Sequence, residues 1–555
     1  MPVAFWQVYG CPFNQLSSFK NIHRMKTKFI LLVCTLLVVF TGCRKTLLDT
    51  KNENAYDALT YFKTKKEFNE AIIAGYAVLN HGGMMSREWY FNFDLMANDA
   101  SPAFSLVGTE LQLSNYSYTN ANPDIVMLWA SLYRMIFRAN LALEVMKKWT
   151  PGTATEEGLK KQYTAEAHWL RGFGYFYLVS CWGRVPLKLD FEASLRNPEP
   201  RAAVADVWKL VEAEFSAAIP DLPVNYASGD LGRATKGAGI AYLGKAYLAQ
   251  HKYGPAAEQF EKLTKAPYSY SLDPSFDNLY SDDNINSPEV VFAVNHVFTT
   301  DNTTYYMFDG WEGEDGKTAH TGRAQEYGFN DWYNVDLSDA LVAAFRYGNP
   351  SLPGNPPYLD PRAKLTYYGS AGSGGDEDIC DHCPGGPLPY TDQEIWHGLP
   401  APLPNTWRKY EPYEFQQFTE APRSGINTHV VRYADVKLML AECYIEQNTK
   451  LPEAVGLIND VRNRPSVMAA NYATNLSQAN ARIALRRERQ IELAGEQSRW
   501  FDLRRWGIAK QTQNAERPPG AGQRAFEDKH LLLPIPLGER QTNQAVAGDI
   551  ANDWN

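Results

Sequence analysis

Three glutamates near the carboxyl end of the chain are spaced so that they could act together. Glu488, Glu492 and Glu496 recur every four residues in a segment with helical periodicity, so we expect them on one face of a helix. Two carboxylates about 5–9 Å apart across a cleft are the acid and the base or nucleophile of a glycoside hydrolase. Like charges at this helical spacing repel each other unless cations face them.

The surrounding residues favour a structural role for these glutamates. They sit among the apolar residues Ile491, Leu493 and Trp500, as in a helix that packs on other helices. Arginines are frequent both around this segment and in the one before it: Arg489, Arg499, Arg504 and Arg505, and Arg432, Arg462 and Arg464. The pattern predicts a buried network of ion pairs that fixes helix register, and glycoside hydrolysis is the less favoured alternative.

Other catalytic motifs are missing from the sequence. It contains no G-x-S-x-G, no H-E-x-x-H and no phosphate-binding glycine loop. Cys380 and Cys383 form a single C-x-x-C, whereas a structural zinc site needs further ligands, so a local disulfide is favoured over free thiols or zinc. The net charge of −9 argues against nucleic acid as a partner. We expect a non-enzymatic protein with no cofactor or metal, and nothing in the sequence supports Ca²⁺ in the acidic loops.

The elements that must position these residues are predicted to be mostly helices. Apolar residues recur with helical spacing in 65–80, 125–148, 157–181, 203–219, 236–250, 255–264, 431–447, 452–463 and 478–506. Gly, Pro, Asn and aromatic residues are more frequent in 88–122, 266–336 and 348–428, which predicts long loops with short strands. The β-branched run in 287–297 is the best strand candidate.

Small and aromatic residues repeat within these helical segments. One set matches the tetratricopeptide pattern with its proline one place off, and a second is a looser copy: Leu243, Gly244, Tyr247, Ala256, Phe260 and Pro267, then Ala441, Tyr444, Ala454, Ile458 and Pro465. Gly172 and Tyr175 suggest a third copy. The small residues let two helices approach, so we expect stacked helical hairpins.

The start of the chain is typical of an exported protein. Lys26 and Lys28 precede an apolar run at 29–40, which is too short to span a bilayer, and Cys43 follows a pair of small residues. This arrangement resembles the bacterial lipobox. We therefore expect residues 1–24 to be an over-extended start and residues 25–42 to be a lipoprotein signal peptide. Cys43 would carry the lipid, and an uncleaved signal anchor is the alternative.

A series of further motifs follows in order along the chain. They are CRKTLLDT from Cys43, LWASLYRMIFRANLAL, the run 166–187 with EAHWLRGFGYFYLVSCWGRVPL, the run 232–248 with GRATKGAGIAYLGKAYL, SPEVVFAV, Asp360-Pro361-Arg362, VVRYADVKLMLAECY, AVGLINDVRNR, RERQIELAGEQSRWFDLRRWG and LLLPIPLGE. In this order they resemble the SusD/RagB family of nutrient-binding outer-membrane lipoproteins. The departures are Gln497, where a glycine is usual, and the degenerate end AGDIANDWN.

The resemblance implies both a fold and a function. The fold would be an all-α, tetratricopeptide-like scaffold with long loop-rich insertions and a few short strands. Its N-terminal helical region would span 43–265, and a C-terminal region at 266–555 would carry the ligand-face loops. The protein would be lipid-anchored in the outer membrane and exposed at the cell surface, where it would bind an oligosaccharide and deliver it to a SusC-type TonB-dependent transporter. Capture of a peptide, as in RagB-like relatives, is the alternative.

Two aromatic-rich segments offer groups that suit a sugar. Sugar rings have apolar faces and hydroxyl rims, so their sites combine aromatic side chains with Asp, Asn and Arg. By resemblance the two segments lie together at the ligand face, and they offer Arg87, Trp89, Tyr90, Asn98 and Asp99, and Trp311, Arg323, Trp332 and Tyr333. The alternative is that about half of these aromatics pack the loops themselves. A third cluster, Trp396 and Trp407, is flanked by prolines and favours packing.

Overall fold

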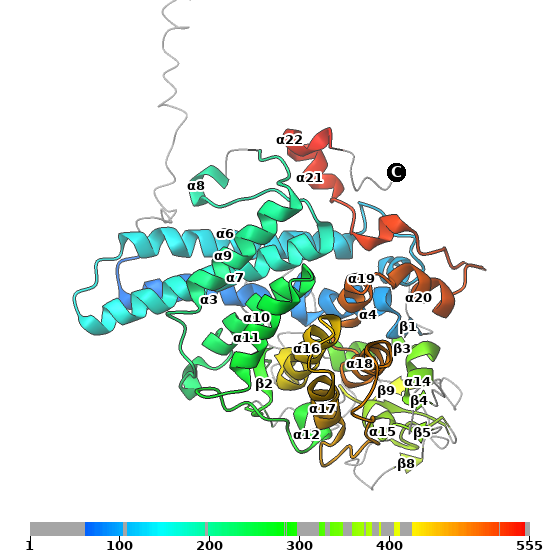
Figure 1. The fold of residues 1–555 in the computed structure, drawn as a ribbon. Helices are drawn as coiled ribbons and strands as arrows, with labels where there is room; N and C mark the ends of the chain where they lie inside the picture. The colour runs from blue at the N-terminus through cyan, green and yellow to red at the C-terminus, as the bar shows by residue number, and fades with distance from the viewer. Residues whose placement is uncertain are drawn as a thin grey trace, which may run out of the picture. The chain divides into compact units, whose positions relative to one another are not determined.

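Long helices dominate the computed structural model of the protein (Figure 1). The structure describes residues 61–103, 108–194, 198–281, 284, 286–296, 321–327, 334–347, 358–370, 373–379, 388–389, 405–410, 424–520 and 522–549. The predicted leader with Cys43, the motif of Cys380 and Cys383, and Trp311, Trp332, Tyr333 and Trp396 lie outside these residues. In the part that the structure describes, no helix combines the length and the apolar character that crossing a membrane requires.

Ten helices lie in the segments for which apolar spacing predicted helix. They are α3 (Lys65–Ala77), α6 (Pro123–Lys148), α7 (Ala154–Trp182), α9 (Val204–Ala218), α10 (Lys236–Ala249), α11 (Tyr253–Leu263), α16 (Tyr433–Glu446), α17 (Leu451–Arg462), α18 (Gln478–Glu492) and α19 (Arg499–Arg505). The periodicity predicted all of these helices, with α18 and α19 as a single segment, and α6 shows how the sequence sets their ends. Its cap Asn122 accepts hydrogen bonds from the backbone N–H groups of Asp124 and Ile125, and Pro123 occupies the first turn, where its missing donor costs nothing.

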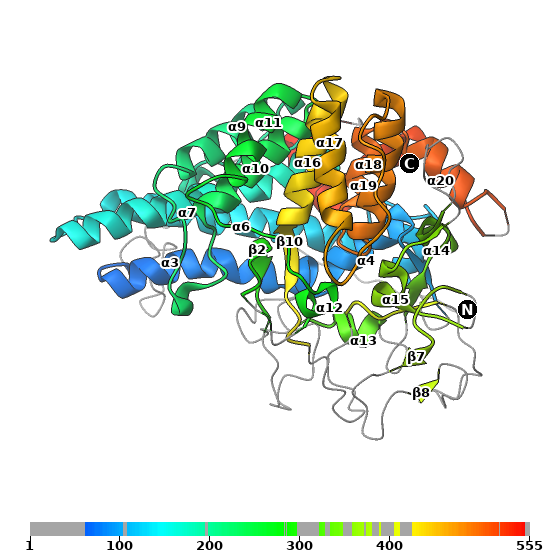
Figure 2. The ribbon, with the colours of Figure 1, turned by 60° about the horizontal axis from the view of Figure 1, so that its bottom comes forward.

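These helices pack as successive hairpins, so that α7 contacts α9, α10 contacts α11, and α16 contacts α17 (Figures 1 and 2). The predicted small residues are the reason that they approach so closely. A Cβ atom at Gly244 would lie 2.6 Å from the ring of Phe260, and one at Gly172 would lie 3.0 Å from the ring of Phe215. The tetratricopeptide-like scaffold is thus confirmed, including the third hairpin that Gly172 suggested.

Shorter elements connect and cover this scaffold. The short helices are η2 (Val78–Asn80), η3 (Gly82–Ser86), α4 (Glu88–Ala97), α5 (Thr109–Ser114), α8 (Phe191–Ser194), η4 (Ser228–Asp230), α12 (Phe276–Leu279), α13 (Arg323–Tyr327), α14 (Asp339–Phe345), α15 (Arg362–Thr366), α20 (Ala509–Glu516), η6 (Asp528–Leu531), α21 (Leu537–Thr542) and α22 (Gln544–Ala547). Of these, α4 lies against α6 and α19.

The described strands form antiparallel pairs. They are β1 (Ala100–Pro102) with β3 (Val335–Leu337), β2 (Val290–Val294) with β10 (Thr428–Arg432), β4 (Arg346–Tyr347) with β5 (Tyr358–Leu359), β6 (Tyr367–Tyr368) with β9 (Thr406–Trp407), and β7 (Asp378–Ile379) with β8 (Leu388–Pro389). The predicted strand in 287–297 is therefore confirmed as β2. Its register sets Val294 opposite Thr428 and Val290 opposite Arg432, which brings Arg432 to the start of α16.

Two predictions about elements are wrong. The stretch 88–122 is not a continuous loop, because α4 and α5 occupy part of it. All ten residues of α4 are buried, and a helix enclosed on every side has no polar face that would reveal its period. The segment 478–506 is not one helix either, since the chain turns between α18 and α19. Gly495 and Gln497 adopt left-handed backbone angles there, with φ of +68° and +57°.

Candidate ligand site

The residues predicted from the first aromatic segment are all buried. Arg87, Trp89, Tyr90, Asn98 and Asp99 are between 1% and 8% exposed. The ring centre of Trp89 lies 4.5 Å from that of Tyr177 of α7, in an edge-on contact typical of packing. The expectation that these side chains lie in a loop open to a ligand is therefore wrong, because α4, which carries Trp89 and Tyr90, is enclosed by its neighbours, and the three flanking residues are buried with it.

The two predicted segments nevertheless lie together in the structure. Nε of Arg87 donates a hydrogen bond to Oε1 of Glu326 at 2.6 Å. Nη2 of Arg323 contacts Oδ2 of Asp94 at 3.1 Å, and its guanidinium carbon lies 3.4 Å from the ring centre of Tyr410. These contacts attach the segment 321–327 to α4. We call the buried ionic residues of this region the anchor cluster, which comprises Arg87, Glu88, Asp94, Asp99, Arg323 and Glu326.

The carboxylates of the anchor cluster are only partly compensated by its cations. Burial raises the pKa of Glu88 to about 8, although Arg87 acts against this shift. Burial likewise raises the pKa of Asp99 to about 8, and its ion pair with Arg499 is long, at 3.6 Å. The pKa values of Asp94 and Glu326 are also raised by burial, against the effects of Arg323 and Arg87. Desolvation thus outweighs ion pairing here.

The anchor cluster lies next in sequence to the other predicted ligand residues. Trp311 precedes the anchored segment 321–327, and Trp332 and Tyr333 directly precede Asn334. The backbone N–H of Asn334 donates to the carbonyl of Glu326 at 2.8 Å. The described residues 321–327 and Asn334, which flank Trp332 and Tyr333 in sequence, are therefore attached to each other and to α4. Trp407, by contrast, is 1% exposed and packs near Tyr327, as the sequence predicted.

The three glutamates of the predicted ladder form ion pairs with arginines. Glu488 accepts from Arg362 and Arg462 at 2.6 and 2.7 Å. Glu492 lies 2.7 Å from Arg362, 2.7 Å from Arg432 and 3.0 Å from Arg464. Glu496 accepts from Arg432 and from Lys409. We call this set the Arg–Glu network; it comprises Glu289, Asp360, Arg362, Lys409, Arg432, Arg462, Arg464, Glu488, Glu492 and Glu496.

The Arg–Glu network is a structural feature, as the sequence predicted. Burial alone would raise the pKa of Glu492, but Arg432, Arg464 and Arg362 lower it to about 2. A carboxylate held ionised by three arginines is poorly suited to donate a proton to a glycosidic oxygen. Arg362 and Glu289 were not predicted as members of this network, although Arg362 lies in the motif Asp360-Pro361-Arg362.

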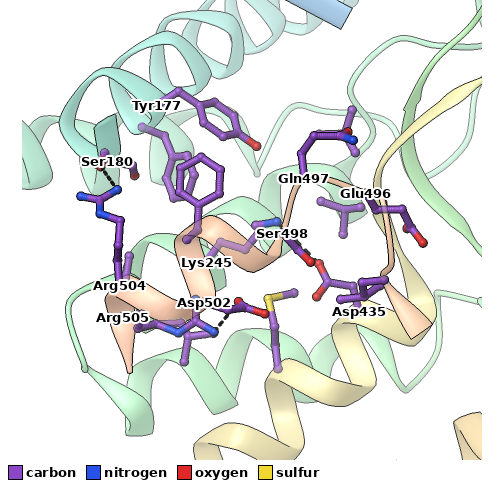
Figure 3. A pocket seen from close by; sticks show the side chains of 18 of the residues that line it. Tyr177, Ser180, Lys245, Asp435, Glu496, Gln497, Ser498, Asp502, Arg504 and Arg505 are labelled. Carbon is purple, nitrogen blue, oxygen red and sulfur yellow. Dashed lines mark hydrogen bonds and ion pairs between the residues drawn. The ribbon is translucent and has the colours of Figure 1, made fainter. Parts of the chain in front are cut away.

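A cavity of about 350 Å³ lies where α7 and α10 face α16 and α19 (Figure 3). Its aromatic lining comes from Trp89, Phe176, Tyr177, Trp208 and Phe501, and its polar lining includes Lys245, Asp435, Gln497, Ser498 and Arg504. Val204 is 40% exposed and His251 is also exposed, so the cavity reaches the surface at these residues. Of the predicted ligand residues that the structure describes, only Trp89 lines the cavity. The sequence did not predict this cavity, because its lining comes from helices that only tertiary packing brings together.

Two arginines at the cavity are each paired with two carboxylates. Arg489 binds Asp435 and Asp502, and Arg505 binds Glu442 and Asp502.

Among the described residues, no group of three or more His, Cys, Asp or Glu side chains is arranged to hold a metal ion.

Two family models match separate parts of the chain. One is described as the SusD family and matches residues 401–547; the other, described as starch-binding and associating with the outer membrane, matches residues 47–248. The motifs, the fold and these matches agree, and the chain belongs to the SusD/RagB family.

The similarity to individual proteins extends over most of the chain. SusD-like protein P2 of Formosa agariphila is 26% identical over 543 residues, which are 94% of this chain and 98% of that protein. A SusD superfamily protein of Bacteroides vulgatus has a TM-score of 0.68 at 23% identity, covering 87% of this chain and 98% of that one. A laminarin-binding SusD-like protein has a TM-score of 0.66 at 24% identity, with the same coverage. These solved structures establish the shared fold.

Proposed function

We propose that this protein is a non-catalytic, glycan-binding lipoprotein that captures an oligosaccharide at the cell surface. The observation that carries this proposal is its family membership over nearly the whole chain, because structural neighbours include proteins described as laminarin-binding and as a surface glycan-binding protein A of Bacteroides fluxus. The Arg–Glu network also supports it, since the carboxylates that most resembled a hydrolase pair hold helices together.

The ligand face that we propose is formed by Trp311, Trp332 and Tyr333. These large aromatics occur in polar segments, where a sugar ring could stack on them. The anchor cluster supports this assignment, because Arg323 and Glu326 fix the intervening residues to α4. A fixed attachment near a stacking side chain reduces the ordering cost of binding. Arg323 would then act by holding the segment rather than by touching the sugar.

Binding of oligosaccharides by the three aromatic residues can be measured by titration calorimetry with a panel of glycans. An aromatic anchor replaced by alanine typically costs about 2 kcal/mol or more, so Trp311→Ala or Trp332→Ala should weaken the best ligand about thirtyfold. Trp506→Ala, at a half-buried tryptophan that directly follows α19, is the matched control. Wild-type affinity in all three ligand-face variants, Tyr333→Ala included, would show that this face is wrong.

We further propose that Cys43 anchors the protein in the outer membrane and that a SusC-type TonB-dependent transporter receives the glycan. The description of one matching family model as associating with the outer membrane supports the location. A single acyl chain binds membranes only marginally, so a cysteine with several chains is needed for stable attachment. Cys43→Ser should leave the protein folded but release it from the membrane fraction, and membrane retention equal to wild type would refute the anchor. A tagged wild-type chain should retain the transporter in detergent extracts.

A further inference from the structure

Arg504 is an unusual cation at the cavity of Figure 3. Its Nη1 donates to the backbone oxygen of Ser180 at 2.7 Å, and its guanidinium carbon lies 4.0 Å from the ring centre of Trp500. Within the described ranges it forms no ion pair with a carboxylate, whereas the neighbouring Arg489 and Arg505 each bind two. Burial lowers the pKa of Arg504 to about 10, so it is still protonated at neutral pH.

Lys245 is a second cation at this cavity with weak compensation. Its Nζ lies 3.5 Å from Oδ2 of Asp435, and Oδ1 of the same carboxylate accepts from Arg489 at 2.8 Å. One carboxylate thus serves two cations. Figure 3 shows Arg504 at one side of the cavity, and Lys245, Ser498 and Asp435 toward the other. A guanidinium without a counter-ion beside a cavity is the arrangement that binds a carboxylate, often through two parallel hydrogen bonds.

The apolar walls of this cavity suit a ring. Phe176, Trp208 and Phe501 line the cavity along with Leu532. A volume of about 350 Å³ is at the small end of ligand sites, which begin at about 300 Å³. The site would therefore hold a ligand of about one or two sugar rings, and its aromatic walls could cover the apolar face of such a ring.

We propose that this cavity is a second binding site, separate from the loop face, for a small sugar that carries a carboxylate, such as a uronate. Arg504 binds the carboxylate, the ring lies against the aromatic wall, and Lys245 and Ser498 bind ring hydroxyls. The choice of a sugar as the ring rests on the proposed function. The cavity itself indicates the negative charge, because Arg504 lacks the carboxylate that its neighbours have.

Arg504 has a structural alternative that the experiment must separate. The carbonyl of Ser180 lies in the last turn of α7, where backbone oxygens lack helical partners and a cation is favourable. If Arg504 only caps α7, its replacement lowers thermal stability and changes no ligand affinity. If it binds an anion, the affinity of the folded protein for that anion falls.

The test is calorimetric titration of the full mature chain with sodium glucuronate, glucose and acetate. Glucose has the same ring without the charge, and acetate has the charge without the ring. We expect glucuronate to bind at least tenfold more tightly than either. Arg504→Gln should weaken glucuronate at least tenfold, and Lys245→Met should weaken it by a smaller factor. Arg486→Gln is the matched control, since Arg486 is half-buried 5.3 Å from the ring of Trp506 but does not line this cavity.

Each outcome decides the proposal. Equal affinity for glucuronate in wild type and in folded Arg504→Gln would overturn it, and so would equal affinity for glucuronate and acetate. Should Arg504→Gln fail to fold, unchanged affinity in Lys245→Met would overturn it instead. If Trp332→Ala abolishes glucuronate binding, the ligand occupies the loop face and this site is wrong. If the protein binds neutral oligosaccharides but not glucuronate, only this inference is wrong. If it binds no sugar at all, the proposed function is wrong as well.

Discussion

The Arg–Glu network and the anchor cluster are both buried, and both combine arginines with carboxylates, yet their charges are balanced differently. Glu492 has three arginines within 3.0 Å, and they lower its pKa to about 2. Asp99 has Arg499 at 3.6 Å, and burial raises its pKa to about 8. Burial is similar at the two sites, so the number and distance of the cations decide the direction of the shift.

This difference separates a fully paired scaffold from a region whose buried charges are only partly compensated. The carboxylates that pair with arginines from β10, α17 and α15 hold the helices of the C-terminal half in register. The anchor cluster joins α4 to the segment 321–327, which lies in sequence between the aromatics that we propose as the ligand face. Strongly perturbed pKa values cluster at functional sites, although structural ion-pair networks perturb pKa values as well. Four changes test whether this contrast is real.

The largest effect is expected at the centre of the Arg–Glu network. Glu492→Ala should lower the free energy of unfolding by about 3–5 kcal/mol, because it leaves buried arginines without a counter-charge. Urea unfolding measures this loss, and glycan affinity of the folded fraction should be unchanged. Glu446→Ala is the matched control: its partner Arg482 is 33% exposed, so this pair should contribute about 1 kcal/mol or less. A loss of similar size in both variants would contradict the contrast.

The sequence predicted the scaffold well because its signals are local. Helical periodicity, the capping residue Asn122 and the pair Gly244 and Phe260 each act between neighbouring residues or adjacent helices. The ion pairing of Glu488, Glu492 and Glu496 was also predicted correctly, because like charges at this helical spacing repel each other unless cations face them. By contrast, α4 could not be predicted, because a helix that is buried on every side gives no amphipathic pattern.

The candidate sites were harder to predict than the fold. Arg362 and Glu492 are 130 residues apart in sequence, and only the fold shows that they are 2.7 Å apart. Lys245 and Arg504, which line one cavity, come from different helices. Trp89 has the residue type of a sugar platform, but its environment makes it a packing residue. Residue type therefore predicted chemistry, and exposure could be known only from the structure.

The second effect tests whether packing rather than charge stabilises the region of the anchor cluster. Trp89 is 4% exposed, and its ring contacts Phe93 and Tyr177. Trp89→Ala should lower the free energy of unfolding by about 3 kcal/mol, the lower end for a buried tryptophan, because the side chain already borders a cavity. Thermal melts and calorimetry on the same variant check this prediction. Weaker glycan binding with an unchanged melting temperature would instead make Trp89 a ligand residue.

The third effect should distinguish the two clusters by function. Arg323→Met removes the cation beside Asp94 but allows that carboxyl, whose pKa is already raised by burial, to become neutral. We expect a loss of about 2 kcal/mol in the free energy of unfolding, on the scale of a lost charged hydrogen bond. Glycan affinity should fall as well, because the segment 321–327 loses an attachment to α4. Unfolding in urea and calorimetry at matched pH test both effects, and a destabilised variant with intact affinity would separate the anchor cluster from binding.

The smallest effect is a difference in pH dependence. The folded-state pKa of Asp99, about 8, lies above its unfolded value, so the stability linked to its proton is present at low pH and is lost as pH rises toward 8. Relative to Asp99→Asn, the wild type should lose about 1 kcal/mol of unfolding free energy per pH unit between about pH 5.5 and 7.5.

The pKa of Glu492 is shifted in the opposite direction. Its folded-state value, about 2, lies below its unfolded value, so its contribution to the free energy of unfolding is lost only as pH falls below about 4.5. The difference in unfolding free energy between wild type and Glu492→Gln should therefore be constant between about pH 5.5 and 7.5. Taking differences from wild type also cancels the opposing slope of His429, whose pKa burial lowers to about 4. Urea unfolding of the three proteins at half-unit pH steps measures these slopes, and parallel profiles for both variants would show that the two clusters are electrostatically alike.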